Sequence, residues 1–150
     1  LQKIKLDRIY WLIAKKNPFK TKAYFSLEER IKLARKATKN FNKIQVLYLD
    51  GKINSSRSID LINYLIEKKK FNNIYFIIGS DILLELHKWK SWKKLVKLTK
   101  LIVFSRKGYD KKGKNSIVVK YLKNKNITFI KNKPIVISSS LIRKKLIKKA

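Results

Sequence analysis

Residues 74–92 read IYFIIGSDILLELHKWKSW. The β-rich apolar run Ile74–Ile78 stops at Gly79-Ser80-Asp81, and Trp89 follows eight residues after the aspartate. The run predicts a buried strand. Glycine lets a ligand approach the backbone closely, and ligands of open α/β sheets bind beyond the carboxyl ends of strands. The stretch therefore indicates a nucleotide site, with an ordinary turn as the alternative interpretation.

Strand-like and helix-like segments alternate on both sides of this run. The expected strands are Arg8–Ala14, Ile44–Leu49 (ended by Asp50-Gly51), Leu101–Ser105, Ile127–Ile130 and Ile135–Ile137. The expected helices are Ser26–Lys39, Ser58–Lys69, Ile82–His87, Ser91–Leu98, Asn115–Lys123 and one that starts near Ser139, while Arg106–Lys114 is expected to be a polar loop. Such alternation predicts an α/β fold with a mostly parallel sheet and right-handed crossovers.

The composition favours one globular domain over residues 1–150, since 45% of the residues are hydrophobic. There is no cysteine, which excludes disulfides and thiolate metal sites and suits a reducing, cytoplasmic compartment. No apolar run approaches the ~18 residues that a membrane span requires. We therefore expect no membrane partner.

The net charge of +30 suggests nucleic-acid binding as one class of function. Only six of the 39 basic residues are arginines, however, and the lysines are spread over every segment. Phosphate-clamping and base-reading surfaces usually favour arginine, whose planar fork binds bidentately. An A/T-rich codon bias explains the lysine excess better, so we expect no specific nucleic-acid partner. A non-catalytic basic nucleic-acid-binding module remains the alternative.

Several motifs, in order, resemble those of the bacterial nicotinate-nucleotide adenylyltransferases, a family of the Rossmann-like nucleotidyltransferase superfamily. The resemblance runs nearly end to end. It implies a doubly wound, mostly parallel sheet. The matching segments are Tyr10–Ile13 with Asn17-Pro18-Phe19-Lys20, Ser26–Arg30, Gly79-Ser80-Asp81, Trp89 with Trp92, Arg106, and Ile137–Arg143.

The resemblance implies a reaction between two small molecules. Nicotinate mononucleotide attacks the α-phosphate of ATP, usually with Mg²⁺, and yields deamido-NAD and pyrophosphate. Such a transfer depends on positioning and charge neutralisation more than on covalent chemistry. A sister nucleotidyltransferase that uses nicotinamide mononucleotide or phosphopantetheine is the alternative enzyme.

The resemblance also implies an ATP site. Free N–H groups at a helix start bind anions, and an arginine can fork onto phosphate oxygens. Taken alone, a serine N-cap with a solvated arginine, or an aspartate N-cap, would explain the same residues. The residues implied for ATP are Gly79, Asp81, Arg106, Ser138, Ser139, Ser140 and Arg143.

A second set of residues is implied for nicotinate mononucleotide: Asn17, Lys20, Ser58 and Trp89. Lys20 would neutralise the phosphate, and Trp89 would stack on the pyridine ring. Ser58 corresponds to the family's Ser-Tyr-Thr segment, in which Arg57 here replaces the aromatic residue. The bland interpretations are a surface lysine and a core tryptophan.

The family's Gly-x-Phe-Asp-Pro-x-His-x-Gly-His motif has no counterpart in these 150 residues. We expect it upstream of Leu1, together with the first, central strand of the sheet. No catalytic residue is therefore assigned within this chain, and none is assigned to a metal. An N-terminally truncated single domain is expected to be poorly stable and inactive without that segment.

Overall fold

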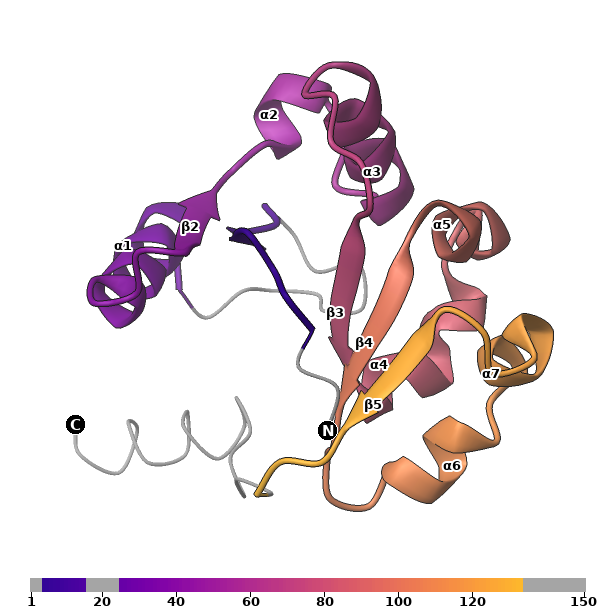
Figure 1. The fold of residues 1–150 in the computed structure, drawn as a ribbon. Helices are drawn as coiled ribbons and strands as arrows, with labels where there is room; N and C mark the ends of the chain where they lie inside the picture. Colours follow the sequence, from indigo (N-terminus) through magenta and orange to yellow (C-terminus); the bar gives the residue numbers. More distant parts are fainter. Residues whose placement is uncertain (1–3, 16–24, 134–150) are drawn as a thin grey trace. The chain divides into compact units, whose positions relative to one another are not determined.

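The computed structural model describes residues 4–15 and 25–133 and is mixed α/β (Figure 1). The chain forms two compact units, Leu1–Lys70 and Phe71–Ala150, each described here by itself. The Asn17-Pro18-Phe19-Lys20 segment, the strand expected at 135–137 and the helix expected near Ser139 lie outside the described residues.

The first unit contains a parallel pair of strands, β1 (Ile9–Leu12) and β2 (Ile44–Leu47). Both strands were predicted, but each ends two residues earlier than expected. The helix α1 (Leu27–Thr38) packs on the pair, and Ile13, Ala34 and Val46 form a small core. The βαβ unit anticipated from the alternating pattern is thus present.

Ser26 caps α1 as the sequence predicted. The Ser26 hydroxyl accepts a hydrogen bond from the Glu29 N–H at 3.1 Å, and the Glu29 carboxylate accepts one from the Ser26 N–H at 2.8 Å. This reciprocal capping box satisfies two backbone donors that no intrahelical carbonyl can reach. It confirms the predicted start of the helix.

Two further helices complete the first unit, α2 (Asp50–Ile53) and α3 (Ser58–Glu67). The helix α3 buries Ile59, Ile62 and Leu65, the apolar face that its sequence periodicity predicted. The short helix α2 was not predicted, because Asp50-Gly51 was interpreted only as the end of a strand. Asp50 instead begins the helical turn.

The second unit contains a fully parallel sheet in the order β3–β4–β5, composed of Tyr75–Gly79, Lys100–Phe104 and Ile127–Ile130. Gly79 pairs with Phe104, so β3 and β4 end at the same level. Leu101 and Val103 are almost fully buried. The continuous apolar runs predicted for these strands match this burial.

Helices cover one face of this sheet (Figure 1). Leu83, Leu86, Val96 and Val118 are completely buried and form its core. The opposite face carries Ile77, which is 40% exposed within the described part of the chain. The helices are α4 (Ser80–Glu85), the 3₁₀ turn η1 (Leu86–Lys88), α5 (Trp92–Leu98), α6 (Asp110–Lys114) and α7 (Ile117–Leu122).

The expected loop Arg106–Lys114 was wrong in its second half, where α6 lies. All five residues of α6 are charged or glycine, so no apolar periodicity predicted this helix. Gly113 of this helix packs tightly on α4: a Cβ there would lie 3.1 Å from the Ser80 carbonyl oxygen. In the described residues, no helix is both long and apolar enough to cross a bilayer.

Candidate functional site at the ends of β3 and β4

Three of the residues predicted for the nucleotide site meet where β3 and β4 end. Gly79 is the last residue of β3 and the N-cap of α4, and Asp81 lies in the first turn of that helix. Arg106 follows β4 by two residues. Because neighbouring parallel strands expose their carboxyl ends at one edge, these side chains come together there.

A side chain at position 79 would displace the carboxylate of Asp81. A Cβ built on Gly79 would lie 2.5 Å from Oδ1 of Asp81, closer than any real side chain comes. The carboxylate thus occupies the space that a side chain at position 79 would fill. The sequence suggested that this glycine admits a ligand; in the structure it first admits the aspartate.

Asp81 and Arg106 form an ion pair across the strand ends. Nη1 of Arg106 donates to Oδ2 of Asp81 at 2.6 Å. The guanidinium is half exposed, with 48% of its side chain accessible, so it can also reach an anionic ligand. Oδ1 of Asp81 is buried, and no donor in residues 4–15 and 25–133 hydrogen bonds to it.

A buried carboxylate oxygen without a donor is costly, on the order of 1–3 kcal/mol for an unsatisfied polar group. A hydroxyl group that donated to the Asp81 carboxylate would remove that cost. Sugar hydroxyls are donors of this kind, whereas the nearby Arg106 suits phosphate. The pair can therefore bind a molecule that carries both groups.

Asp110, the first residue of α6, ties these strand ends together. Its Oδ1 accepts hydrogen bonds from the Ser80 hydroxyl at 2.7 Å and from the Arg106 N–H at 2.9 Å. Its Oδ2 accepts one from the Ser105 hydroxyl. These bonds, those from Ser105 and Ser80 above all, lower the pKa of Asp110 below its ordinary value, and Lys114 adds a smaller electrostatic effect.

Asp110 was missed by the sequence reasoning because it stood inside an expected loop. A usable signal was present, namely a serine at the end of a strand and an aspartate five residues later, at the start of a helical turn. Ser80, which is 1% exposed, was likewise quoted only as part of the Gly-Ser-Asp motif.

Trp89 lies farther from this edge. Its ring meets that of Phe76 edge to face, with centroids 6.3 Å apart. Phe76 precedes Gly79 by three residues, or about 10 Å along a strand. The structure therefore places Trp89 beside the body of β3, and its predicted role in stacking on a pyridine ring stays a prediction. Trp92 packs on Tyr121 instead, with centroids 5.0 Å apart.

In the first unit, Arg30 fixes the end of β1. Its guanidinium donates to the carbonyls of Ala14 at 2.7 Å and Lys15 at 2.8 Å. The Lys15 N–H donates in turn to Oδ2 of Asp50, at 2.7 Å. These bonds hold the chain just before residues 16–24, which include the predicted Asn17 and Lys20.

Ser58 is the first residue of α3, after the N-cap residue Arg57. The adjacent turn is held by Ser55, whose hydroxyl donates to Asp60 at 2.6 Å and accepts from the Arg57 N–H at 3.1 Å. Ser58 thus stands at a helix start, as the predicted backbone contacts require. The remaining predicted site residues lie outside the described part of the chain: Asn17, Lys20, Ser138, Ser139, Ser140 and Arg143.

The carboxylates of the described residues do not gather into a metal cage. Within 4–15 and 25–133, no three His, Cys, Asp or Glu side chains lie close enough together to hold an ion. Mg²⁺ commonly binds through one or two carboxylates with waters and substrate phosphates.

Comparison with known proteins places this geometry in context. A family profile described as cytidylyltransferase-like matches residues 1–145. A "Probable nicotinate-nucleotide adenylyltransferase" of Pelagibacter ubique is 43% identical over 94% of this chain and 78% of its own length. A protein of the same name from Endomicrobium trichonymphae is 35% identical over 93% of this chain and 70% of its own length.

A solved structure shares the fold. It is the nicotinic acid mononucleotide adenylyltransferase of Plasmodium falciparum complexed with NaAD, with a TM-score of 0.72 and 22% identity over 93% of this chain and 69% of that one. The likeness confirms the predicted Rossmann-like α/β fold with parallel strands.

Proposed function

We propose a function from one premise: the chain belongs to the nicotinate-nucleotide adenylyltransferases, within the cytidylyltransferase-like family. The protein transfers AMP from ATP to nicotinate mononucleotide, in the biosynthesis of NAD. The observation that carries this proposal is the cluster of Gly79, Asp81 and Arg106 at a parallel strand edge, in a chain 43% identical to a relative of that name. The substrates are small molecules.

The reaction exchanges one phosphorus–oxygen bond for another. A phosphate oxygen of the mononucleotide attacks the α-phosphorus of ATP, and the bond to the bridging oxygen of the β-phosphate breaks. Pyrophosphate leaves with that electron pair, and deamido-NAD remains. The protein contributes by aligning the two phosphates and by offsetting their negative charge.

ATP is assigned to the strand edge of the second unit. Asp81 accepts a hydrogen bond from a ribose hydroxyl, and Arg106 turns part of its guanidinium to a phosphate. Gly79 leaves room for the Asp81 carboxylate, since a Cβ at position 79 would collide with Oδ1 of Asp81. Ser138, Ser139, Ser140 and Arg143 are assigned to the triphosphate because serine-capped helix starts with a nearby arginine bind anions.

Four residues are assigned to the mononucleotide. Lys20 and Asn17 bind its phosphate side. The chain just before them is held at Lys15, whose carbonyl accepts from Arg30 and whose N–H donates to Asp50. Ser58 offers a helix-start N–H to the nicotinate carboxylate. Trp89 stacks on the pyridine ring, an interaction worth ~0.5–1.5 kcal/mol beyond area burial for aromatic pairs.

Mg²⁺ is assigned to the ATP rather than to a protein cage. Bound with ATP, the ion would supply charge neutralisation on the phosphates. Asp81 and Arg106 bind and orient the nucleotide. Removing the ion with a chelator is expected to abolish turnover without unfolding the protein.

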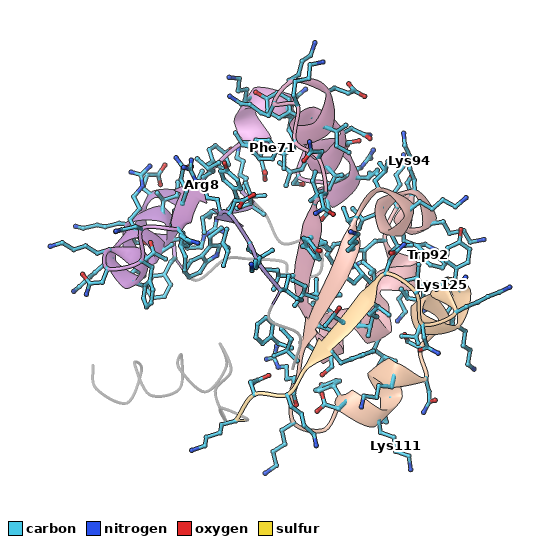
Figure 2. The ribbon with its side chains drawn as sticks, in the orientation of Figure 1. Arg8, Phe71, Trp92, Lys94, Lys111 and Lys125 are labelled. Carbon is cyan, nitrogen blue, oxygen red and sulfur yellow. The ribbon has the colours of Figure 1, made fainter. Side chains whose placement is uncertain are left out.

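The net positive charge of the chain is not assigned to nucleic-acid binding. Lys94 on α5, Lys111 on α6 and Lys125 in the turn between α7 and β5 lie apart from one another in the second unit (Figure 2). We therefore assign no specific nucleic-acid partner. We place the protein in the cytoplasm, on the grounds that a chain without cysteine suits a reducing compartment.

Pyrophosphate release from ATP by the full-length protein tests the function. Nicotinate mononucleotide, nicotinamide mononucleotide and phosphopantetheine are offered as acceptors, and the products are identified by mass. The proposal requires deamido-NAD as the main product. A preference for either other acceptor identifies a sister enzyme, and ATP-independent, salt-sensitive RNA binding without turnover contradicts the proposal.

A further inference from the structure

The carboxylate of Asp110 uses both oxygens to join three elements. Oδ1 accepts from Ser80, at the start of α4, and from the Arg106 N–H, after β4. Oδ2 accepts from Ser105, the residue that directly follows β4. All three partners are donors, so the ionised carboxylate matches them without a competing proton.

Arg106 is held on both sides of its Cα by this arrangement. Its N–H also approaches the Ser80 hydroxyl at 3.0 Å, and its carbonyl accepts from the Tyr109 N–H at 3.0 Å in a tight turn. Gly108 adopts a φ of 86° in that turn, which suits glycine. Asp110 comes directly after the turn and closes it.

The side chain of Arg106 has little else to hold it. It is half exposed, and its recorded contact in the described residues is the ion pair with Asp81. A long exposed side chain loses much rotamer entropy when it is ordered. A fixed backbone at Arg106 therefore decides how well its guanidinium stays beside Asp81.

We infer that Asp110 is a positioning residue of the nucleotide site: its carboxylate holds the turn after β4 so that Arg106 faces Asp81 and the ATP phosphates. This inference rests on the proposed function. Asp110 acts through Arg106 and does not touch the reacting atoms. The Ser80 and Ser105 hydroxyls serve the same purpose from the two strand ends.

Two variants of Asp110 separate geometry from charge. In Asp110→Asn the amide oxygen can still accept from Ser80 and Arg106, and its NH₂ can donate to a rotated Ser105 hydroxyl. In Asp110→Ala all three bonds are lost. We expect Asp110→Ala to raise the KM for ATP about tenfold, since small misplacements of positioning groups cost up to ~10²-fold. Asp110→Asn is expected to stay within about twofold, and the KM for the mononucleotide to stay unchanged in both.

A double-mutant cycle tests whether Asp110 acts through Arg106. In an Arg106→Ala background, Asp110→Ala is expected to change the KM for ATP by less than about twofold, because coupled sites are not additive. Equal effects in both backgrounds would overturn the inference, since they would indicate general loosening of the unit. Ser105→Ala provides a milder second variant if Asp110→Ala fails to fold.

Ser116→Ala is the matched control. Like Ser80, Ser116 is a buried serine at a helix start in the second unit. Its hydroxyl accepts from the Val119 N–H at 3.4 Å. Its loss is expected to lower thermal stability without altering the KM for ATP. The same change in KM for Ser116→Ala and Asp110→Ala would contradict a positioning role.

ATP binding, measured by calorimetry alongside turnover, keeps the two proposals distinct. If the wild type makes no deamido-NAD but its ATP affinity depends on Arg106 and Asp110 non-additively, the function fails and the positioning role stands. If the wild type makes deamido-NAD and the cycle is additive, the function stands and the positioning role fails.

Discussion

The two units each fix the end of a parallel strand with a charged side chain carried by a helix, but with opposite signs. In the first unit Arg30 donates to the carbonyls of Ala14 and Lys15. In the second, Asp110 accepts from the Arg106 N–H and from two serine hydroxyls. In each unit the sign of the charge suits the groups at the strand end. Carbonyl oxygens follow β1, whereas N–H and hydroxyl donors follow β3 and β4.

The hydrophobic cores next to these two anchors, Arg30 in the first unit and Asp110 in the second, also differ. The second unit has Leu83, Leu86 and Val96 at no exposure, whereas the three buried residues around α1 in the first unit retain 4–9%. A two-stranded pair with one helix is marginal by itself. The anchor of the first unit therefore rests on a weaker core than the anchor of the second.

The largest expected effect comes from the stronger core. Leu83→Ala removes a side chain with 0% exposure and should cost about 3 kcal/mol of unfolding free energy through lost contacts and a cavity. Urea denaturation of the full-length protein measures it. Leu33→Ala, at a residue 50% exposed on α1, is the control and should be nearly neutral. Equal losses would contradict the assignment of Leu83 to the tightly packed core of the second unit.

Arg30→Lys tests the anchor of the first unit. A lysine ammonium is a point charge and cannot fork onto two carbonyls, so the variant should lose on the order of 1 kcal/mol. The KM for the mononucleotide should rise while that for ATP stays constant, the reverse of Asp110→Ala. Steady-state kinetics distinguishes the two, with Arg35→Lys in the same helix as the control. A rise in the KM for ATP alone would contradict the assignment.

The anchor of the second unit should respond to acid. The lowered pKa of Asp110 means that its carboxylate stabilises the fold at pH above its ordinary value of 3.8. That contribution is lost as the pH falls through the lower folded value. In Asp110→Asn the free energy of unfolding should therefore fall less steeply as the pH is lowered. Urea midpoints measured over a range of acidic pH values test this. Asp7→Asn, at an exposed residue, serves as the control. An unchanged pH dependence in Asp110→Asn would contradict a stabilising role for the Asp110 carboxylate.

The smallest expected effect concerns the ion pair itself. Asp81→Asn should change stability by less than about 1 kcal/mol, because solvent screens a pair whose guanidinium is half exposed and because the amide oxygen can still accept from Arg106. Its effect should appear instead in ATP affinity, since the carboxylate is assigned to the ribose. Thermal denaturation and calorimetry compare the two quantities. A large loss of stability with unaltered ATP affinity would make Asp81 a structural residue only.

The sequence alone determined most of the elements. Apolar runs of strand length and the Ser26–Glu29 capping pattern are local signals, and they predicted β3, β4, β5 and α1 within about two residues. The strand-end position of Gly79, Asp81 and Arg106 also followed, because parallel strands bring their carboxyl ends together.

The tertiary structure decided what no local pattern encodes. Gly113 of α6 packs against Ser80, and Asp110 acquires its role only where β3, β4 and α6 meet. Strand and cap signals depend on neighbours in the sequence. The Ser80–Asp110 and Asp81–Arg106 contacts instead join residues 30 and 25 positions apart, which only folding brings together.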